Sequence, residues 1–339
     1  MKIKRVLITG ITGMVGSHLL DLLSKNSNLK IYGLCRWNSK YDNIISHMRK
    51  INSNNIELIC GDLRDPISIY KLMEKSRPDQ IYHLAAQSFP TASFSNPIET
   101  YETNINGTAT ILEASKNLKN KNIKIHICSS SEVYGKVDKK YIPINESVPF
   151  HPASPYAISK VGTDLVAQHY AEAYGLNIFI TRMFTHTGPR RSDFFHESTF
   201  AKQIALIEKK IISPIIKVGN LDSLRTYADV RDAVNAYSLL MNSQKTKPGD
   251  VFNIGGDYSC TVRETLNFLV KLSHFRKKIK IIVERDRLRP LDADLQVPDI
   301  LKFKKIIYWK KKYTYKKTMV DLLNFWRKRI KESGDIIIR

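Results

Sequence analysis

Short apolar runs alternate with longer amphipathic stretches along the first half of the chain. The apolar runs cover about 5–9, 30–35, 56–60, 79–84, 123–128 and 177–181. Almost continuously apolar runs of this length are typical of parallel strands that are buried on both faces. We therefore expect a parallel sheet whose strands end at one common edge, where a dinucleotide would lie.

Helical periodicity fills the connections between these runs. We expect helices from the first glycine-rich turn to about 25, and over about 66–76, 97–118, 198–210, 229–241, 262–272 and 314–331. This alternation predicts an α/β fold: a Rossmann-type doubly wound parallel sheet with a smaller mixed C-terminal substrate-binding domain. Residues 1–182 would form the NADP-binding domain, to which about 226–258 would return, and 183–339 would mainly form the substrate domain.

A glycine-rich turn joins the first strand to the first helix. Gly10, Gly13 and Gly16 have the spacing Gly-x-x-Gly-x-x-Gly, which is not the commonest dinucleotide fingerprint but stands at the first strand–helix junction. Glycines let the backbone approach a pyrophosphate, and a helix N-terminus presents free N–H groups to it. The expected cofactor contacts in this turn are Gly10, Thr12, Gly13, Met14, Val15 and Gly16.

The residues after the next strands bear on which dinucleotide is bound. Arg36 follows the second strand, where an NAD site usually has Asp or Glu, and arginine suits the 2′-phosphate of NADP. Arg36 could also point to solvent, in which case other residues would select between NAD and NADP. Asp62 can accept from the adenine amino group or cap a turn. We expect NADP, with contacts from Arg36, Asp62, Leu63 and the segment Leu84, Ala85 and Ala86, whose small side chains leave room for it.

Tyr156 and Lys160 are four residues apart, so on a helix they share one face. A tyrosine with a pKa of about 10 is a poor base at neutral pH, and an ammonium group beside it favours the phenolate. Ser130, just after the fifth strand, is a candidate to hold the hydroxyl or carbonyl that gains or loses the proton. Tyr-x-x-x-Lys occurs often by chance, and the glycine-rich turn together with Ser-Ser-Ser-Glu at 129–132 is what makes a catalytic site the expectation.

Composition indicates a soluble globular protein. The chain has 339 residues, 42% of them hydrophobic, and is long enough for a sizeable core. No apolar run approaches the roughly 18 residues of a membrane span, and the N-terminus does not resemble a signal sequence, so we expect a cytoplasmic protein. The scattered cysteines fit no metal spacing, and we expect no metal site; they are Cys35, Cys60, Cys128 and Cys260.

The net charge of +22 is unusual, and residues 271–339 contain 21 Lys and Arg against 8 Asp and Glu. One interpretation is binding to nucleic acid or to an anionic membrane. The other is solvated helix faces. Because the basic residues alternate with Trp309, Tyr313 and Trp326 at core-like spacings, we expect solvated faces and no nucleic-acid or membrane partner.

Together these motifs carry a family resemblance over nearly the whole chain. The first half of the chain resembles the extended short-chain dehydrogenase/reductases that modify nucleotide sugars. The motifs that carry this resemblance are the glycine turn, Asp62-Leu63, 84–87, 130–132 and Tyr156-x-x-x-Lys160. The segments 184–191, 218–225, 229–232 and 289–294 are similar to those of the GDP-mannose 4,6-dehydratases and the related GDP-4-keto-6-deoxyhexose reductases. The resemblance implies a GDP-linked nucleotide-sugar substrate, a tightly held and recycled NADP, and a homodimer or homotetramer.

The resemblance also assigns roles to individual residues. Tyr156 would take the proton of the sugar 4-hydroxyl beside Lys160, Ser130 would polarise the C4 oxygen, and Glu132 would remove the C5 proton and help the C6 hydroxyl to leave. Tyr156 and Lys160 would also contact the cofactor. The implied substrate contacts are Gln87, Ser88, Glu132, His186, Arg190, Lys217, Asn220, Arg225 and Arg289.

Some of these substrate contacts have plainer alternatives. Arg190, Arg225 and Arg289 are forked donors suited to a diphosphate, although each alone is more often a structural ion-pair partner. His186 would contact the sugar or brace its own loop.

Three functions stay open at this point. A nucleotide-sugar 4,6-dehydratase is favoured by Glu132, but the related reductases also carry Ser-Ser-Glu. An NADPH-dependent GDP-4-keto-6-deoxyhexose reductase is favoured by three departures from the dehydratase pattern. Met14-Val15 stands where dehydratases often have Gln-Asp, Trp37 stands where a second arginine is common, and Lys202-Gln203 resembles the reductases. A non-catalytic NADP-binding regulator, or a nucleic-acid-binding relative, is suggested only by the charge.

Overall fold

The computed structural model describes residues 3–51, 55–118, 120, 122–284 and 295–333. Its centre is a seven-stranded, wholly parallel sheet in the order β10-β6-β5-β4-β1-β2-β3. The strands are β1 (Lys4–Thr9), β2 (Leu29–Cys35), β3 (Ile56–Cys60), β4 (Gln80–His83), β5 (Lys124–Cys128), β6 (Asn177–Met183) and β10 (Val251–Ile254). The Rossmann-type architecture predicted from the sequence is therefore confirmed.

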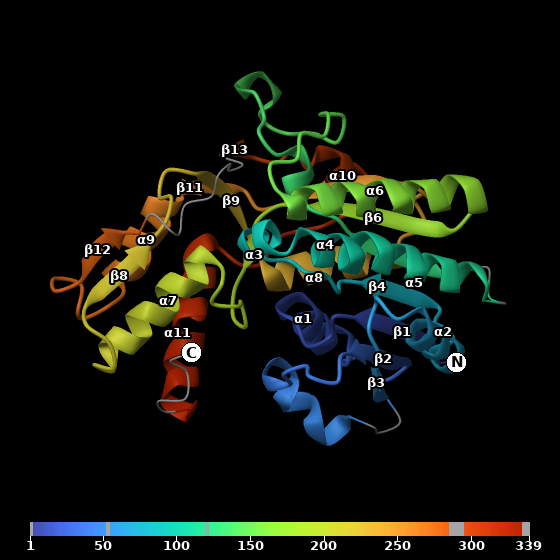
Figure 1. Ribbon diagram of the computed structural model, residues 1–339, viewed down its shortest axis with the longest axis horizontal. Helices are drawn as coiled ribbons and strands as arrows, with labels where there is room; N and C mark the ends of the chain where they lie inside the picture. The colour runs from blue at the N-terminus through green and yellow to red at the C-terminus, as the bar shows by residue number, and fades with distance from the viewer. Residues whose placement is uncertain (1–2, 52–54, 119, 121, 285–294, 334–339) are drawn as a thin grey trace.

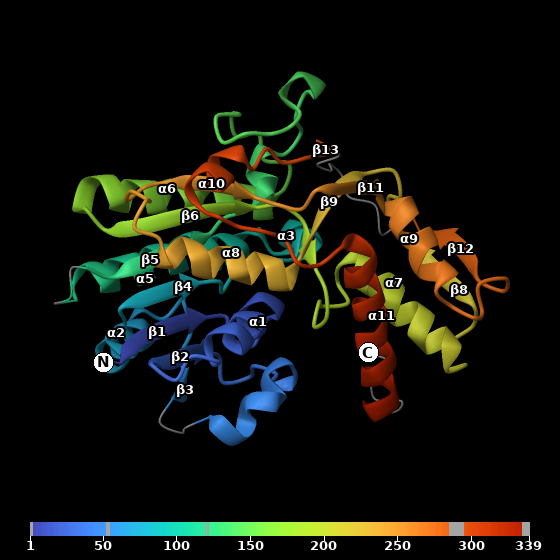
Figure 2. The same ribbon diagram turned by 180° about the vertical axis from the view of Figure 1, so that it is seen from behind.

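Helices cover both faces of this sheet (Figures 1 and 2). On one face α1 (Met14–Leu23) packs against α8 (Val230–Asn242), and their apolar side chains share one buried cluster with β1 and β10. On the other face lie α2 (Pro66–Ser76), α5 (Gly107–Lys116) and α6 (Pro155–Tyr174), over a second buried cluster. Burial on both faces explains why the strands are almost continuously apolar.

The single helix expected over 97–118 is interrupted. The structure has α4 (Pro97–Tyr101), a π-helical segment η2 (Glu102–Asn106), and then α5, with the short α3 (Pro90–Ser95) before them. Asn104 lies in the π segment, where its side-chain amide donates to the Gln87 carbonyl at 2.9 Å and to Ser159 Oγ at 2.8 Å. Its oxygen accepts from the Gln87 N–H at 2.8 Å. The irregular turn thus ties the loop after β4 to α6.

The second half of the chain builds a smaller unit over the carboxyl edge of the sheet, which we call the cap. Its helices are α7 (His196–Glu208), α9 (Val262–Lys271) and α11 (Tyr315–Ser333), which enclose their own apolar cluster. Its strands form a β12–β8 pair and a small sheet in the order β11-β9-β13, with β7 beside β9. They are β7 (His186–Thr187), β8 (Ile215–Val218), β9 (Leu224–Asp229), β11 (Tyr258–Thr261), β12 (Lys280–Val283) and β13 (Leu295–Gln296).

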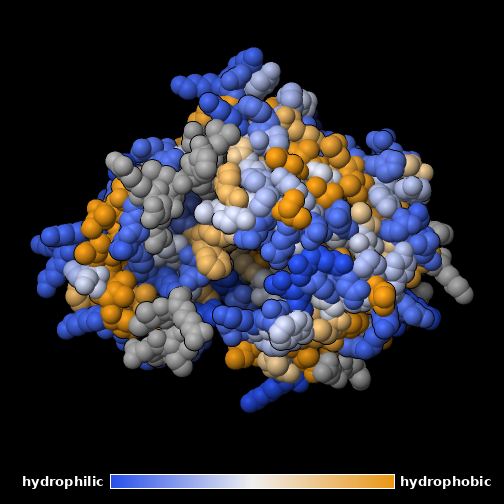
Figure 3. Space-filling view, in the orientation of Figure 1, coloured by the Kyte–Doolittle hydropathy of each residue, from blue (hydrophilic) through white to orange (hydrophobic). Residues whose placement is uncertain are grey.

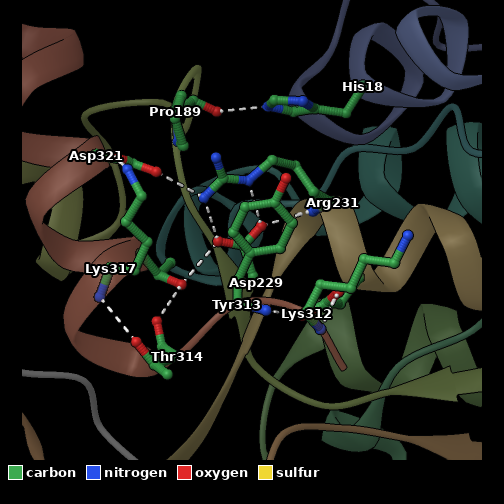
Figure 4. Close-up of polar contacts among 11 residues, drawn as sticks. His18, Pro189, Asp229, Arg231, Lys312, Tyr313, Thr314, Lys317 and Asp321 are labelled. Carbon is green, nitrogen blue, oxygen red and sulfur yellow. Dashed lines mark hydrogen bonds and ion pairs between the residues drawn. The ribbon is translucent and has the colours of Figure 1, made fainter. Parts of the chain in front are cut away.

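A buried polar cluster fixes α11 against the start of α8 (Figure 4). Asp229 caps α8 and accepts from the Arg231 N–H at 2.8 Å. The Arg231 guanidinium lies 2.7 Å from Asp229 Oδ2 and 2.9 Å from Asp321 Oδ2 of α11, and Thr318 Oγ1 donates to Asp229 at 2.7 Å. Because Asp229 has no exposed side-chain surface, this paired carboxylate holds the cap rigidly to the sheet.

The remaining described segments connect these units. They are η1 (Asp42–Lys50), η3 (Ser131–Tyr134), η4 (Lys139–Tyr141) and α10 (Leu301–Ile306). Within the described ranges no helix is long and apolar enough to cross a membrane, and no group of three or more His, Cys, Asp or Glu could hold a metal ion.

Candidate active site

One large cleft, about 2200 Å³ in volume, separates the carboxyl edge of the sheet from the cap. The surface is hollowed between these two parts (Figure 3). Of the predicted site residues, the following line it: Gly10, Thr12, Gly13, Met14, Val15, Gly16, Arg36, Asp62, Leu63, Leu84, Ala85, Ala86, Gln87, Ser88, Ser130, Glu132, Tyr156, Lys160, His186, Arg190, Lys217, Asn220 and Arg225. Arg289 lies outside the described residues.

The glycine turn at one end of the cleft requires glycine for steric reasons. Gly10 has φ +70°, and a Cβ placed there would stand 2.9 Å from the Ala85 backbone. A Cβ on Gly16 would stand 2.2 Å from the Gly10 carbonyl oxygen. Gly13 is the N-cap of α1 and has no side chain to satisfy the N–H groups of the first turn. Close backbone approach and uncapped N–H donors are what a pyrophosphate needs, so the turn fits a dinucleotide.

Arg36 and Asp62 end adjacent strands beside this turn. Arg36 is exposed and lines the cleft, a position compatible with a 2′-phosphate. The Asp62 carboxylate accepts from Arg64 Nε at 3.2 Å and Arg64 Nη2 at 3.0 Å, and this guanidinium lowers the pKa of Asp62. Asp62 also accepts from the Arg64 N–H at 2.9 Å, as in the turn alternative. Its carboxylate is therefore oriented by Arg64 as well as facing the cleft.

The catalytic candidates meet at the middle of the cleft. Helix α6 begins just before Tyr156, because Ser154 caps it by accepting from the Ala157 N–H at 3.0 Å. Lys160, one turn later, donates to the Cys128 carbonyl at 2.7 Å. Ser130, two residues beyond β5, hydrogen-bonds the Tyr156 phenol. The end of β5 and the start of α6 thus position these groups together.

The charge state of Tyr156 depends on competing influences. Burial raises the pKa of Tyr156, whereas the Ser130 hydrogen bond and the Arg191 guanidinium lower it. Burial also lowers the pKa of Lys160. Deprotonation of Tyr156 therefore relies on the Ser130 hydrogen bond and the Arg191 charge, which favour the phenolate over the neutral phenol.

Glu132 faces the same point from η3. Its side chain is half-buried, lines the cleft, and lies close enough for its charge to raise the pKa of Tyr156. Its backbone N–H donates to Ser130 Oγ at 3.2 Å, which couples the position of Glu132 to that of the serine. A carboxylate, a hydroxyl, a phenol and an amine therefore surround one part of the cleft.

His186 lies in the short strand β7, and Arg190 lies in the loop between β7 and α7. His186 Nδ1 is 3.2 Å from the Phe184 carbonyl, and burial lowers the pKa of His186 to about 4, so the ring is neutral near pH 7. This hydrogen bond braces the loop while the ring lines the cleft. Arg190 Nη1 lies 2.7 Å from Asp21 Oδ2 as an ion pair.

The cap supplies the other predicted polar residues. Lys217 lies 2.8 Å from Glu284, and Asn220 Nδ2 donates to Ser223 Oγ at 3.0 Å. Arg225 is buried, and its Nη1 donates to the carbonyl of the residue before it at 3.0 Å. Each side chain is held by a neighbour and still lines the cleft, so their donors surround its cap end.

An aromatic and ionic wall of the cleft was not predicted from the sequence. The Phe89 and Phe194 rings stack with centroids 5.1 Å apart, joining the sheet side to the cap side. The Arg191 guanidinium lies 3.3 Å from the Phe195 ring centroid and 3.2 Å from the buried Glu197 carboxylate. In the sequence, 183–196 contains Gly, Pro and adjacent Arg but little periodicity, which is typical of a functional loop.

Comparisons with known proteins agree with this geometry. A family model described as GDP-mannose 4,6 dehydratase matches residues 7–322. Over 329 residues the chain is 31% identical to "GDP-mannose 4,6 dehydratase 1" of Arabidopsis thaliana, covering 94% of this chain and 89% of that protein. It is 26% identical to "GDP-6-deoxy-D-mannose reductase" of Pseudomonas aeruginosa, covering 97% and 99% of the two chains.

A solved structure shows the same fold with a cofactor bound. The structure of RMD from Pseudomonas aeruginosa complexed with NADPH matches with a TM-score of 0.78 at 25% identity, covering 96% of this chain and 100% of that chain. The family model spans nearly the whole sequence, and the fold and the cleft residues agree with it. The chain therefore belongs to the GDP-mannose 4,6-dehydratase family of extended short-chain dehydrogenase/reductases.

Proposed function

We propose that this protein is a nucleotide-sugar 4,6-dehydratase that converts GDP-mannose, or a close GDP-linked manno sugar such as a heptose, to its 4-keto-6-deoxy derivative. The observation that carries the proposal is the Glu132 carboxylate beside the Tyr156 and Ser130 pair. Water loss from C5 and C6 needs a base for the C5 proton, separate from the base that acts at the 4-hydroxyl.

The residues of the cleft divide the proton transfers between them. Tyr156 takes the proton of the sugar 4-hydroxyl, and Ser130 holds the C4 oxygen as it becomes a carbonyl. The ketone at C4 acidifies the C5 proton, which Glu132 removes before protonating the departing C6 hydroxyl. NADP, if held by the glycine turn and Lys160, would supply the acceptor for the hydride that leaves C4 and the donor of that hydride to C6, and C5 would take up a proton to complete the 4-keto-6-deoxy product. Lys160, fixed by the Cys128 carbonyl, would hold the nicotinamide ribose.

The glycine turn and Arg36 would hold the cofactor, and we propose that it is NADP, not NAD. The exposed arginine at the end of β2 supports this choice, because its guanidinium suits a 2′-phosphate. Residues 1–182, with about 226–258, would form the cofactor domain, and the rest of 183–339 would mainly bind the nucleotide sugar. The position of β10 in the central sheet supports this division. A homodimer or homotetramer and a cytoplasmic location remain predictions.

A GDP-4-keto-6-deoxyhexose reductase is the second candidate. The similarity to the Pseudomonas aeruginosa reductase extends over 97% of this chain and 99% of that protein. Met14, Val15 and the exposed Trp37 also depart from the dehydratase pattern. A reductase would use the same Tyr156 to protonate the C4 oxygen and would release its cofactor after each turnover.

One experiment separates the two activities. Pure protein is incubated with GDP-mannose and no added cofactor, and the molecular mass of the product is measured by mass spectrometry. A product lighter by one water supports the dehydratase. Activity only with added NADPH and a 4-keto-6-deoxy substrate identifies the reductase and overturns the proposal.

A further inference from the structure

Two ion pairs join the opposite walls of the cleft. Arg329 Nη2 of α11 lies 2.6 Å from Asp42 Oδ2 of η1, although the residues are far apart in sequence. Arg190 Nη1, in the loop between β7 and α7, lies 2.7 Å from Asp21 Oδ2 of α1. Asp42, Arg190 and Arg329 all line the cleft. In each pair the acid belongs to the cofactor side and the arginine approaches from the other side.

Asp42 is tied to the glycine turn. The next residue, Asn43, donates from Nδ2 to the Thr12 carbonyl at 3.0 Å. Later in η1, His47 Nε2 lies 2.7 Å from Asp21 Oδ1. These contacts attach η1 to the glycine turn and to α1, the two elements that would hold the pyrophosphate.

Arg329 lies over aromatic rings of its own helix on the cap side. Its guanidinium lies 5.7 Å from the Trp326 ring and 5.9 Å from the Phe325 ring on the same helix. Trp326 is buried, and its Nε1 donates to Ser198 Oγ of α7 at 2.8 Å. The Asp42–Arg329 pair therefore links two structures that are each internally fixed.

The Arg190 contact shows that its loop is pinned in place. Arg190 has φ +70°, a left-handed conformation that a non-glycine residue keeps only when its surroundings hold it there. Its Nη1 faces Asp21 as a close ion pair without hydrogen-bond geometry. Beside it, His18 Nε2 lies 3.0 Å from the Pro189 carbonyl (Figure 4). The loop is thus fastened to α1, the helix that starts at the dinucleotide turn.

We propose that the Asp42–Arg329 and Asp21–Arg190 pairs form a clasp that closes the cleft over bound NADP and slows its release. This role rests on the proposed dehydratase function, in which the hydride returns to the sugar and the cofactor stays bound between turnovers. The clasp residues would act by keeping the two walls together, so they are positioning residues and not catalytic ones.

Charge reversal tests the clasp directly. In Asp42→Arg or Arg329→Asp alone, two like charges face each other, and the double variant restores an opposite pair. We expect each single reversal to speed NADPH release roughly 3- to 10-fold, and the double reversal to recover most of the wild-type rate. Release is followed by the fall in NADPH fluorescence when excess NADP+ is mixed in.

Ionic strength gives a second readout that a purely structural defect would not produce. Salt screens attraction in the wild type and repulsion in the single reversals. Salt also screens the attraction between the protein and the phosphates of NADPH in every variant. Added salt should therefore speed NADPH release more in the wild type than in either single reversal. Lys331→Asp is the matched control, since it reverses an exposed charge on the same helix away from the cleft, and it should release NADPH at the wild-type rate.

Wild-type release rates in both single reversals, or a double reversal no slower than the singles, would overturn the clasp. If a reversal does not fold, Asp42→Asn and Arg329→Gln carry the same test with a smaller increase expected. Release is measured without sugar, so the result is independent of water loss from GDP-mannose. A protein that fails to remove water yet shows the reversal pattern keeps the clasp and loses the proposed function.

Discussion

Glu132 is the side chain on which the chemistry of the cleft depends. Ser130, Tyr156 and Lys160 suffice to move a proton at a hydroxyl next to a hydride acceptor, and that step is shared by oxidations and reductions of many alcohols. Loss of water needs a further group at C5 and C6. The half-buried carboxylate of Glu132 beside Tyr156 can supply it.

Replacing this carboxylate by an amide should separate the two halves of the reaction. In Glu132→Gln we expect NADP binding and C4 oxidation to persist, because Tyr156 is unchanged. Water loss should fall about 10²- to 10⁴-fold, the usual effect of removing a general base. The checks are exchange of solvent deuterium into C5 by NMR, which should stop, and the absorbance of reduced nicotinamide, which should accumulate.

Glu74→Gln is the control for this variant, because Glu74 is an exposed glutamate on α2 outside the cleft. It should exchange deuterium and release water at wild-type rates. Wild-type turnover in Glu132→Gln would show that another group removes the C5 proton.

At this scale sequence spacing points to the motif residues but not to their partners in the folded protein. Tyr156, Lys160 and Ser130 belong to a local pattern that sequence spacing reveals. Arg191 and Glu197 do not, because an ion pair beside a phenylalanine ring follows no periodicity that can be recognised in one sequence. The effect of Arg191 on the pKa of Tyr156 appears only once the chain is folded, when Glu197 of α7 also pairs with Arg191.

Among the elements, the β1–turn–α1 unit shows most clearly how sequence determines a binding site. The strand supplies a buried anchor, the turn excludes side chains, and the helix supplies donors. The strand positions in this half of the chain were predictable to within a few residues, since the apolar runs are almost continuous and are separated by amphipathic stretches.

Gly16→Ala should damage this unit specifically. The new Cβ would meet backbone atoms, the Gly10 carbonyl at 2.2 Å and the Ile11 Cα at 2.7 Å, so the turn has to open. We expect NADPH affinity to fall at least about tenfold, because the N–H donors move away from the pyrophosphate. Fluorescence titration measures the affinity.

Gly175→Ala provides the comparison. Gly175 ends α6 with φ +64° and has nothing within 4 Å of a new Cβ, so the variant should lose about 1 kcal/mol of folding stability. Its NADPH affinity should stay unchanged. Equal losses of affinity in the two glycine variants would mean that the turn has no special steric role.

Other elements could not be predicted from local patterns. The π segment at 102–106 has the same apolar spacing as the helices around it, and only the tertiary contacts of Asn104 show why the helix is irregular there. The cap strands β7 and β13 are two residues each, too short to produce any periodicity. Their pairing with β9 depends on the rest of the fold.

For the molecule as a whole, two buried histidines predict how stability depends on pH. His83 and His126 are both buried, and burial lowers the pKa of each to about 3. In the unfolded chain they would titrate at about 6.5, so below that pH the unfolded state binds more protons than the folded one. The free energy of unfolding should therefore fall as pH drops from about 6.5 towards 3.

The expected slope is up to about 1.4 kcal/mol per pH unit for each histidine. Urea unfolding at several pH values between about 7.5 and 5 measures this slope. This range lies within roughly two units of the pKa of histidine in the unfolded chain. His83→Gln with His126→Gln should weaken this dependence, leaving the contribution of His186, whose pKa burial also lowers to about 4, whereas the exposed His151→Gln should not change it. A double variant as acid-sensitive as the wild type would place the sensitivity in other groups.

Near the C-terminus, basic residues alternate with buried tryptophans. Trp309 and Trp326 are buried, while Lys304, Lys305 and Lys310 between and around them are exposed. Their alternation reflects which side of each segment faces the core.

The route of the chain between sheet and cap has a consequence for engineering. After β6 the polypeptide enters the cap, returns through α8 and β10, and leaves again for α9 before closing with α11. A chimera that borrows sugar selectivity from a homologue therefore cannot be made at a single splice junction. It must exchange several separate segments and keep Asp229, Arg231 and Asp321 from one parent, because these residues fasten the grafted part to its host.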